Sequence, residues 1–235
     1  AWTSILTGVN PGEHGVFDFA RLVKGSYDVE FAGASLRRRP PLPVIASDAG
    51  LRVACIGFPA TYPPSPINGI MIGGFDSPVA VSIDDSFAYP RALAGELRKR
   101  FGPYVFADFA ETRSWTPGWH KRAAKKLMAG LERRAKITEY LAARERWDLF
   151  MVHFGESDTV SHHFWAFHDT LSPRHPARGA AVELQAAIQK VYMRLDAAVG
   201  RLLDQVGAHA HVMVVSDHGF GGAGDKVLYL NRWLA

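Results

Sequence analysis

Two short apolar runs, at residues 149–152 and 212–215, flank a long amphipathic stretch. Runs of this length suit buried strands. Between them, the apolar residues of 179–206 recur at spacings of three and four, which is typical of a helix with one buried face, and Gly207 is a natural stop. Two strands joined by a helical crossover pair in parallel. This order predicts an α/β fold in which the two runs are parallel, neighbouring strands of one sheet.

Composition supports a folded, globular chain. Its 235 residues suffice for one sizeable α/β domain or two small ones, and 48% hydrophobic against 21% charged residues gives enough material for a core. The formal charge of +4 is mild, and the basic residues concentrate at 37–39, 98–100 and 120–146. They are best interpreted as solvated helix faces, compatible with an anionic substrate. They are not interleaved with aromatic residues, so we expect no nucleic-acid partner.

The single cysteine and the two chain ends bear on location and completeness. Cys55 lies in an apolar run, where we expect a small core residue. One cysteine cannot form a disulfide framework within the chain, which favours a reducing compartment, and we expect the cytoplasm. No run approaches the length of a transmembrane span. The chain opens at Ala1 and stops at Ala235 without terminal features, so we expect one incomplete domain over residues 1–235.

Other segments predict the remaining architecture. We expect helices at residues 1–8, 45–50 and 89–100, strands at 51–58 and 70–72, and a proline-rich loop at 59–66. A long helix should begin at Thr116 and Pro117, because threonine can accept from first-turn amides and proline sacrifices no hydrogen bond there. It should run to about Arg146. Residues 20–43 are expected to be irregular, and both they and 87–120 to be peripheral excursions that shape a pocket.

Each apolar run is followed by an aspartate and a histidine. Asp158 and His162 are four residues apart, so a helix starting just after the strand would put both on one face. Asp217 and His218 are adjacent and would face opposite ways on a regular strand, but the glycine-rich sequel permits an irregular strand end where they converge. Because ligands collect at the carboxyl ends of strands in open α/β sheets, we expect all four side chains to meet.

Carboxylate and imidazole groups without thiolates suit divalent metals, zinc first, with manganese or iron as alternatives. Two such ions about 3.5–4 Å apart could hold both the attacking and the leaving oxygen of a phosphoryl transfer. Either motif alone is weak, since an aspartate can equally cap a helix. We expect His163 to be a neighbour and His153 a hydrogen-bonded core histidine. Glu156 is either an acceptor behind a ligand or a solvated side chain, and both interpretations stay open.

Several ordered motifs carry a family resemblance. Residues 1–15 contain Thr-Gly, Pro and His-Gly landmarks, and residues 155–162 and 215–220 contain the two Asp/His clusters. Together with 61–64 and 230–234, these motifs resemble the alkaline phosphatase superfamily. The resemblance is closest to the type I phosphodiesterase/nucleotide pyrophosphatase branch and its predicted phosphohydrolase or phosphomutase relatives, and it spans essentially the whole chain.

The resemblance implies an alkaline-phosphatase-like α/β fold, with a largely parallel central sheet and helices on both faces. It implies that Asp158 and His162 hold one metal ion and that Asp217 and His218 hold another. The implied activity is hydrolysis of a small anionic phosphate ester, either a monoester or a diester, through a covalent phospho-threonine or phospho-serine. The nucleophile would stand about three positions before Ala1, with a further aspartate upstream of it and a third histidine beyond the last residue.

Other activities of the same superfamily, and one of a different class, are alternatives to this interpretation. A sulfatase would have an arginine near position 2, where this chain has Trp2. This difference argues against sulfate esters. The pyrophosphatases use an asparagine near the position of Asp18 or Phe19, and none stands there, so that substrate contact is not implied. A phosphomutase would use the same metals and nucleophile, and a metal-binding domain without turnover is the alternative of a different class. The sequence leaves the oligomeric state open.

Overall fold

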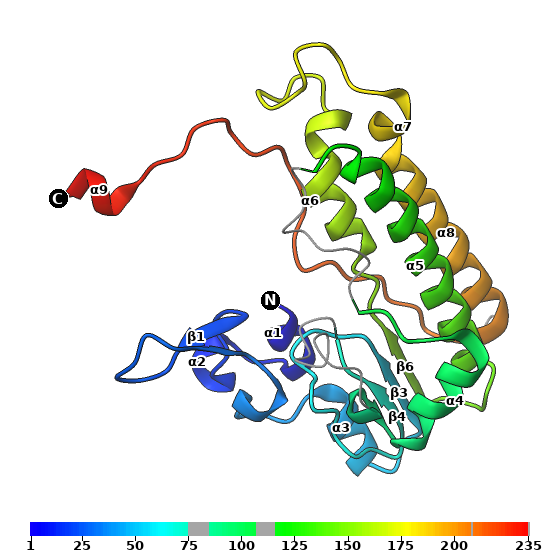
Figure 1. Ribbon diagram of the computed structural model, residues 1–235. Coiled ribbons are helices and arrows are strands. Elements are labelled where there is room, and N and C mark those ends of the chain that lie inside the picture. Colours follow the sequence, from blue (N-terminus) through cyan, green and yellow to red (C-terminus); the bar gives the residue numbers. More distant parts are fainter. Residues whose placement is uncertain (75–84, 107–115, 208, 235) are drawn as a thin grey trace.

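The computed structural model describes residues 1–74, 85–106, 116–207 and 209–234 (Figure 1). Its helices, 3-10 turns (η) and strands are α1 (Trp2–Thr7), α2 (Pro11–His14), β1 (Ala20–Leu22), β2 (Val29–Phe31), η1 (Ala34–Leu36), α3 (Leu42–Asp48), β3 (Val53–Ile56), β4 (Gly69–Ile72), η3 (Asp85–Phe87), β5 (Ala88–Tyr89), α4 (Ala92–Phe101), α5 (Trp119–Ala142), β6 (Leu149–Val152), α6 (Glu156–His168), α7 (Val182–Gln185), α8 (Ala187–Val206) and α9 (Leu230–Leu234). Helices and strands thus combine in one α/β fold.

The central sheet has the strand order β5-β4-β3-β6. Strand β3 pairs in parallel with both β4 and β6, whereas the two-residue strand β5 pairs antiparallel with β4. The register places Cys55 opposite Met71 on one side and Met151 on the other. The predicted largely parallel sheet is confirmed, with its antiparallel pair confined to one edge.

Helices cover both faces of this sheet, because successive side chains of a strand point to opposite faces. Val53 and Cys55 pack with Leu6 of α1 and Ala46 of α3 on one face. Ile56, with its neighbour Ala54, packs against α4 and α5 on the other. The predicted two-sided covering is therefore confirmed.

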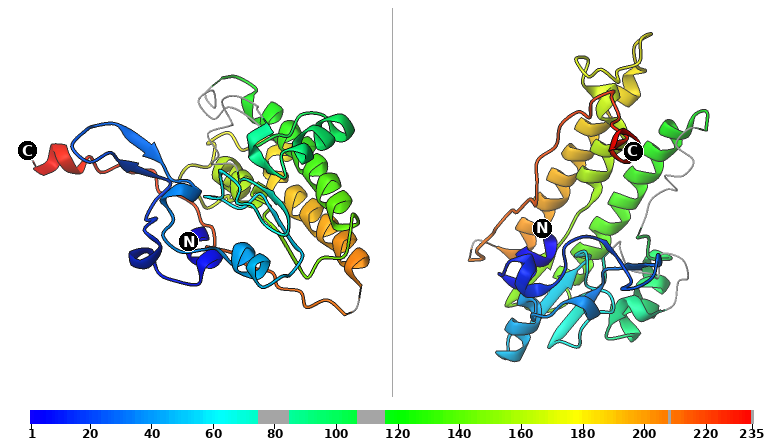
Figure 2. Two further views of the ribbon diagram at one scale, coloured as in Figure 1. Left: turned by 90° about the horizontal axis from the view of Figure 1, so that it is seen from below. Right: turned by 90° about the vertical axis from the view of Figure 1, so that its left-hand side faces the viewer.

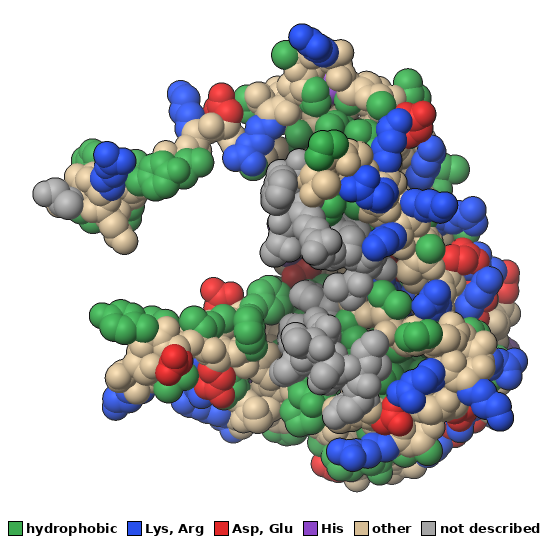
Figure 3. All heavy atoms as spheres, in the orientation of Figure 1, with side chains coloured by type: hydrophobic (Ala, Val, Ile, Leu, Met, Phe, Trp, Pro, Cys, Tyr) green, Lys and Arg blue, Asp and Glu red, His purple; other side chains and the backbone are tan. Residues whose placement is uncertain are grey.

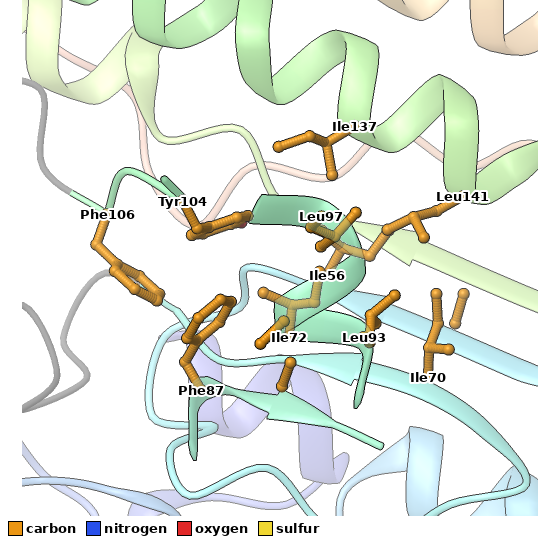
Figure 4. Packing of buried hydrophobic residues seen from close by; sticks show 13 residues of the cluster. Ile56, Ile70, Ile72, Phe87, Leu93, Leu97, Tyr104, Phe106, Ile137 and Leu141 are labelled. Carbon is orange, nitrogen blue, oxygen red and sulfur yellow. The ribbon is translucent and has the colours of Figure 1, made fainter. Parts of the chain in front are cut away.

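The larger core cluster lies between the sheet and helices α4 and α5. Figure 4 shows Ile56 and Ile72 of the sheet facing Leu93 and Leu97 of α4, with Ile137 of α5 above them. Aromatic rings close one end of the cluster: Phe87 stacks on Tyr104 at 5.1 Å and meets Phe106 edge to face at 5.2 Å. This packing fixes α5, which the candidate site uses as a support.

Helices α5, α6 and α8 pack together in a helical layer, and α5 joins this layer to the sheet (Figure 2). Their shared core contains Leu127 and Leu131 of α5, Val160 and Phe164 of α6, and Val191 of α8. Lys and Arg side chains spread over its solvent face, as expected for solvated helices (Figure 3). The layer therefore holds α6, and with it Asp158 and His162, by apolar contacts on its inner side.

One predicted strand does not form. Residues 211–215 have no strand structure, and Val212, Met213, Val214 and Val215 are 57%, 85%, 85% and 49% exposed. The neighbour of β6 in the sheet is β3 instead. The prediction of two neighbouring strands was wrong because strand propensity creates a strand only where another backbone supplies hydrogen bonds, and 211–215 has no strand partner among the described residues.

The segment 20–43, predicted to be irregular, contains an antiparallel hairpin. Strands β1 and β2 pair Arg21 with Glu30, and these side chains form an ion pair at 2.8 Å. The alternate side chains Leu22, Val29 and Phe31 are exposed and apolar. The prediction overlooked the two-residue alternation that distinguishes a strand from an excursion. Figures 1 and 2 place this hairpin and α9 on the side of the molecule opposite α8.

Two helix boundaries also differ from expectation. Helix α5 begins at Trp119, after Gly118 in a left-handed conformation, and has no side-chain cap, so Thr116 is not the cap. The helix predicted for 179–206 is divided, because α7 ends at Gln185 and α8 begins at Ala187. The stop at Gly207 is confirmed.

The domain boundaries stay a prediction: one domain over 1–235, with excursions at 20–43 and 87–120. Within the second excursion, residues 107–115 lie outside the described residues, while α4 contributes Leu93 and Leu97 to the larger core. No described helix has the length and apolar character that crossing a bilayer requires.

Candidate metal centre

Helix α6 carries the first Asp/His pair. It begins directly after β6, with Gly155 as its flanking residue, so the side chains of Asp158 and His162 leave the same face one turn apart. Nε2 of His162 lies 3.5 Å from Oδ1 of Asp158. The prediction that these two side chains lie on one face of a helix is confirmed.

The second pair reaches α6 from the glycine-rich loop of residues 216–224. Nε2 of His218 lies 3.6 Å from Oδ1 of Asp158 and 3.7 Å from Oδ2 of Asp217. The structure therefore brings Asp158, His162, Asp217 and His218 into one cluster. They meet through a loop laid on α6 and not through the ends of two adjacent strands.

Aromatic packing holds this loop against the helix. The ring of Phe220 meets the imidazole of His162 edge to face at 4.9 Å. It also packs, in a tilted arrangement, on the indole of Trp165 at 5.4 Å. Gly222 passes so close that a Cβ there would lie 3.1 Å from Nε1 of Trp165. Further along the loop, Nε of Arg174 donates to the carbonyl of Gly224 at 2.7 Å. The sequence shows Phe220 two residues after His218, but no local pattern there predicts its contacts with α6.

The four side chains differ in exposure and charge environment. Asp158, His162 and His218 are 47%, 61% and 54% exposed, whereas Asp217 is only 16% exposed. A hydrogen bond to the backbone carbonyl of Gly219, and then the carboxylate of Asp217, raise the pKa of His218.

The donor set fits divalent cations held by pairs of ligands. Two ligands of a tetrahedral ion, each about 2.1 Å from it, lie about 3.4 Å apart. The 3.5 Å between Asp158 and His162 matches this separation, and the 3.7 Å between Asp217 and His218 is close to it. In the part of the chain that the structure describes, no three carboxylate, imidazole or thiol groups are arranged to hold a single ion. The geometry therefore offers two incomplete pairs.

Comparison with known proteins identifies the family. The family model described as type I phosphodiesterase/nucleotide pyrophosphatase matches residues 1–235. The chain belongs to the type I phosphodiesterase/nucleotide pyrophosphatase family. Searches of curated proteins and of solved structures found no match. Membership confirms the resemblance to the alkaline phosphatase superfamily and places the chain among the phosphoric ester hydrolases, a typically metal-dependent group.

Two histidines near the cluster in this phosphodiesterase family member, His153 and His163, have other contacts. His153 lies behind the cluster: its Nδ1 is 3.1 Å from the carbonyl of Gly57, which can only accept, so Nδ1 carries the proton. Its ring also meets Trp2 edge to face at 4.6 Å, and burial lowers its pKa to about 4. The ring of His163 packs edge to face on Trp119 at 5.2 Å.

A part-buried serine-histidine pair, overlooked in the sequence, involves Ser4 and His14. Oγ of Ser4 lies 2.9 Å from Nε2 of His14, whose Nδ1 accepts the backbone N–H of Val16 at 3.1 Å. Because Nδ1 accepts this N–H, it carries no proton, so the ring is neutral and its single proton sits on Nε2. Burial also lowers the pKa of His14. His14 therefore donates to Ser4 and is not a base that activates it. In this family member the pair joins α1 to α2.

Proposed function

We propose that the protein hydrolyses small anionic phosphate esters with two divalent metal ions. Asp158 and His162 would hold one ion, and Asp217 and His218 the other. The single observation that carries this proposal is the approach of Oδ1 of Asp158 to Nε2 of His218, 3.6 Å across two separate segments of the chain. Zinc suits the donor set best, with manganese or iron as alternatives.

The residues of the chain would hold and orient the ions, and partly neutralise their charge. Each pair combines one carboxylate with one imidazole, so two ions would keep a net positive charge after binding. When bound, ions of this kind polarise phosphoryl oxygens and lower the pKa of a coordinated hydroxyl. Asp217, the least exposed of the four, is best shielded from competing water. The exposed Asp158, His162 and His218 leave the other side open to substrate.

We infer that a threonine or serine just upstream of Ala1 is the nucleophile. The ring of Trp2 lies 4.6 Å from that of His153, the residue after β6, so a side chain a few residues before Ala1 would lie near the carboxyl end of the sheet and the cluster. Its oxygen would form a bond to phosphorus while the bond from phosphorus to the leaving alcohol breaks, and the alkoxide leaves with a proton. Water would then hydrolyse the phosphorylated side chain and regenerate the hydroxyl.

The substrate is proposed only by class. The chain carries a net charge of +4, which favours an anionic ester over a neutral one. Cys55 is fully buried and is the only cysteine, so we retain the cytoplasm as the proposed location. The alternatives are a phosphomutase of the same superfamily and a metal-binding domain without turnover, and both are outcomes of the experiment below.

A substrate screen combined with metal analysis tests this proposal. The complete protein is assayed on aryl phosphomonoesters, phosphodiesters and sulfate esters with Zn²⁺, Mn²⁺ and Fe²⁺. We expect about two ions per chain and turnover of phosphate esters alone. Transfer of the phosphoryl group to a second alcohol without hydrolysis would identify a mutase, and stoichiometric metal without turnover would identify a binding domain.

The variant Asp217→Ala tests the site assignment within the same experiment. We expect it to lose one ion together with activity, because it removes the best-shielded ligand. Asp225→Ala is the matched control, since Asp225 is an exposed aspartate of the same segment with no site contact. Full metal content and turnover in Asp217→Ala would show that the assignment is wrong.

A further inference from the structure

A buried ion pair lies directly behind the candidate metal centre. Glu156 is the first residue of α6 and is 1% exposed. Its Oε1 accepts from Nε of Arg134 at 2.5 Å and is also 2.5 Å from Nη2 of that residue. Arg134 belongs to α5, its side chain is 14% exposed, and it also donates to the carbonyl of Val105 at 3.0 Å. The pair thus ties the first turn of α6 to the middle of α5.

The pair does not face the metal ligands. Residues two apart on a helix lie about 200° apart around its axis, so Glu156 and Asp158 leave α6 on different sides. Glu156 points into the α5 side, whereas Asp158 points toward His218. Glu156 therefore influences the cluster only through the backbone of α6.

Three simpler explanations do not account for Glu156. It is no helix cap, because α6 has no side-chain cap hydrogen bond. It lines no substrate pocket, since the cavity beside Arg134 measures about 10 Å³, room for one water at most. It is a poor device for stability, because burying two charges costs about as much as their attraction returns. Its second oxygen, Oε2, is buried without a hydrogen-bond partner among the described residues.

A costly buried pair at this place is best explained by specificity of orientation. A two-nitrogen fork from Arg134 fixes both the direction and the distance of the Glu156 carboxylate. That constraint sets the rotation of the first helical turn, and Asp158 and His162 follow on that turn and the next. The apolar contacts of Val160 and Phe164 hold α6 against its neighbours, and the ion pair adds a directional constraint that apolar contacts lack.

We propose that Arg134 and Glu156 are positioning residues that fix the rotation of α6 and thereby aim Asp158 and His162 at a divalent cation. The inference rests on the proposed function, since it takes these two side chains as ligands. It adds a pair of residues that touch neither metal nor substrate and whose effect is transmitted by the helix.

The decisive variant is Arg134→Met combined with Glu156→Met. Replacing both charges by apolar side chains of similar volume leaves no unpaired buried charge, so folding should be preserved. We expect the urea midpoint of the metal-free double variant to equal that of the parent, while its affinity for Zn²⁺, measured by competition with a chromophoric chelator, falls by about 10-fold or more. The visible spectrum of bound Co²⁺ should also shift, because it reports ligand geometry.

A second ion pair, also made by a residue of α5, supplies the matched control. Glu139 of α5 pairs with Arg201 of α8 at 2.7 Å, away from α6. Glu139→Met combined with Arg201→Met should leave both Zn²⁺ affinity and the Co²⁺ spectrum unchanged. If the first double variant fails to fold, Arg134→Leu combined with Glu156→Leu, which also leaves no unpaired buried charge, is measured in its place with the same expected loss.

The outcomes separate this inference from the proposed function. A parent protein that binds no Zn²⁺, or an Asp158→Ala variant that binds as tightly as the parent, would overturn the proposed function and the inference with it. If Asp158→Ala loses the ion while the Met or Leu double variant binds Zn²⁺ as tightly as the parent with an unchanged Co²⁺ spectrum, the inference alone is wrong.

Discussion

Oδ1 of Asp158 lies 3.6 Å from Nε2 of His218, although one residue sits on α6 and the other on the loop that follows residues 211–215. The same Oδ1 lies 3.5 Å from Nε2 of His162. Asp158 is therefore the residue at which the two sequence motifs meet. This central place makes the neighbouring ligands and their supports good targets for testing the site.

Neighbouring histidines of α6 give a sharp test of ligand identity. His162→Ala should lose one bound ion per chain, because it removes a donor from the Asp158 pair. His163→Ala should keep both ions, since that ring packs on Trp119 on another face of the helix. Metal analysis of the two purified variants measures the difference. Equal metal content in both would contradict the choice of His162.

Phe220 is expected to act through the position of the loop. Phe220→Ala removes the ring that packs on His162 and Trp165, so Asp217 and His218 should lose their fixed approach to α6. We expect Zn²⁺ affinity to fall about 10-fold, as when groups that orient metal ligands are removed. Phe17→Ala, at a phenylalanine that is 79% exposed, is the control and should have no effect on affinity. Calorimetric titration distinguishes the two.

His153 should make the metal-free protein less stable in acid. Burial lowers its folded-state pKa from 6.5 to about 4, so between these values the unfolded chain binds a proton that the folded chain does not. The contribution of His153 to the free energy of unfolding is complete above pH 6.5. It declines as the pH falls toward 4, by at most about 3 kcal/mol.

The variant His153→Gln isolates this effect, because glutamine can still donate to the carbonyl of Gly57 but does not titrate. Urea unfolding with a chelator present, repeated from pH 7 to pH 4, should show a shallower acid decline for the variant than for the parent. Parallel curves for the two proteins would mean that His153 has no part in the acid response.

Cys55 should be inert in the folded protein. It is fully buried in β3, and burial raises the pKa of its thiol to about 12, so roughly one thiol in ten thousand is ionised at pH 8. Iodoacetamide should leave the native protein unmodified and add one carbamidomethyl group in guanidinium chloride. Mass spectrometry measures both states, and rapid labelling without denaturant would contradict the burial of β3.

Local patterns were enough to predict part of this fold and site. The one-turn spacing of Asp158 and His162 is set within α6 itself, so it could be predicted without knowing the rest of the molecule. The buried strands β3 and β4 and the half-buried strand β6 are similarly marked by their apolar runs.

Non-local relationships could not be predicted in this way. Residues 211–215 are as apolar as β6, but a strand also needs a hydrogen-bonding neighbour, and no local pattern encodes that neighbour. The pairing of Arg134 with Glu156 joins two helices, and the docking of Phe220 on Trp165 joins a loop to a helix. The meeting of His218 with Asp158 was predicted correctly, although by adjacent strands and not by a loop.

The unpaired edge of the sheet affects how the protein behaves in concentrated solution. Strand β6 is an edge strand among the described residues, and the run from Val212 to Val215 lies exposed. Bare strand edges and solvent-exposed valine-rich runs are the elements through which separate chains aggregate. Concentrated preparations should therefore precipitate, and a gatekeeper lysine introduced by Val214→Lys should raise solubility without entering the sheet.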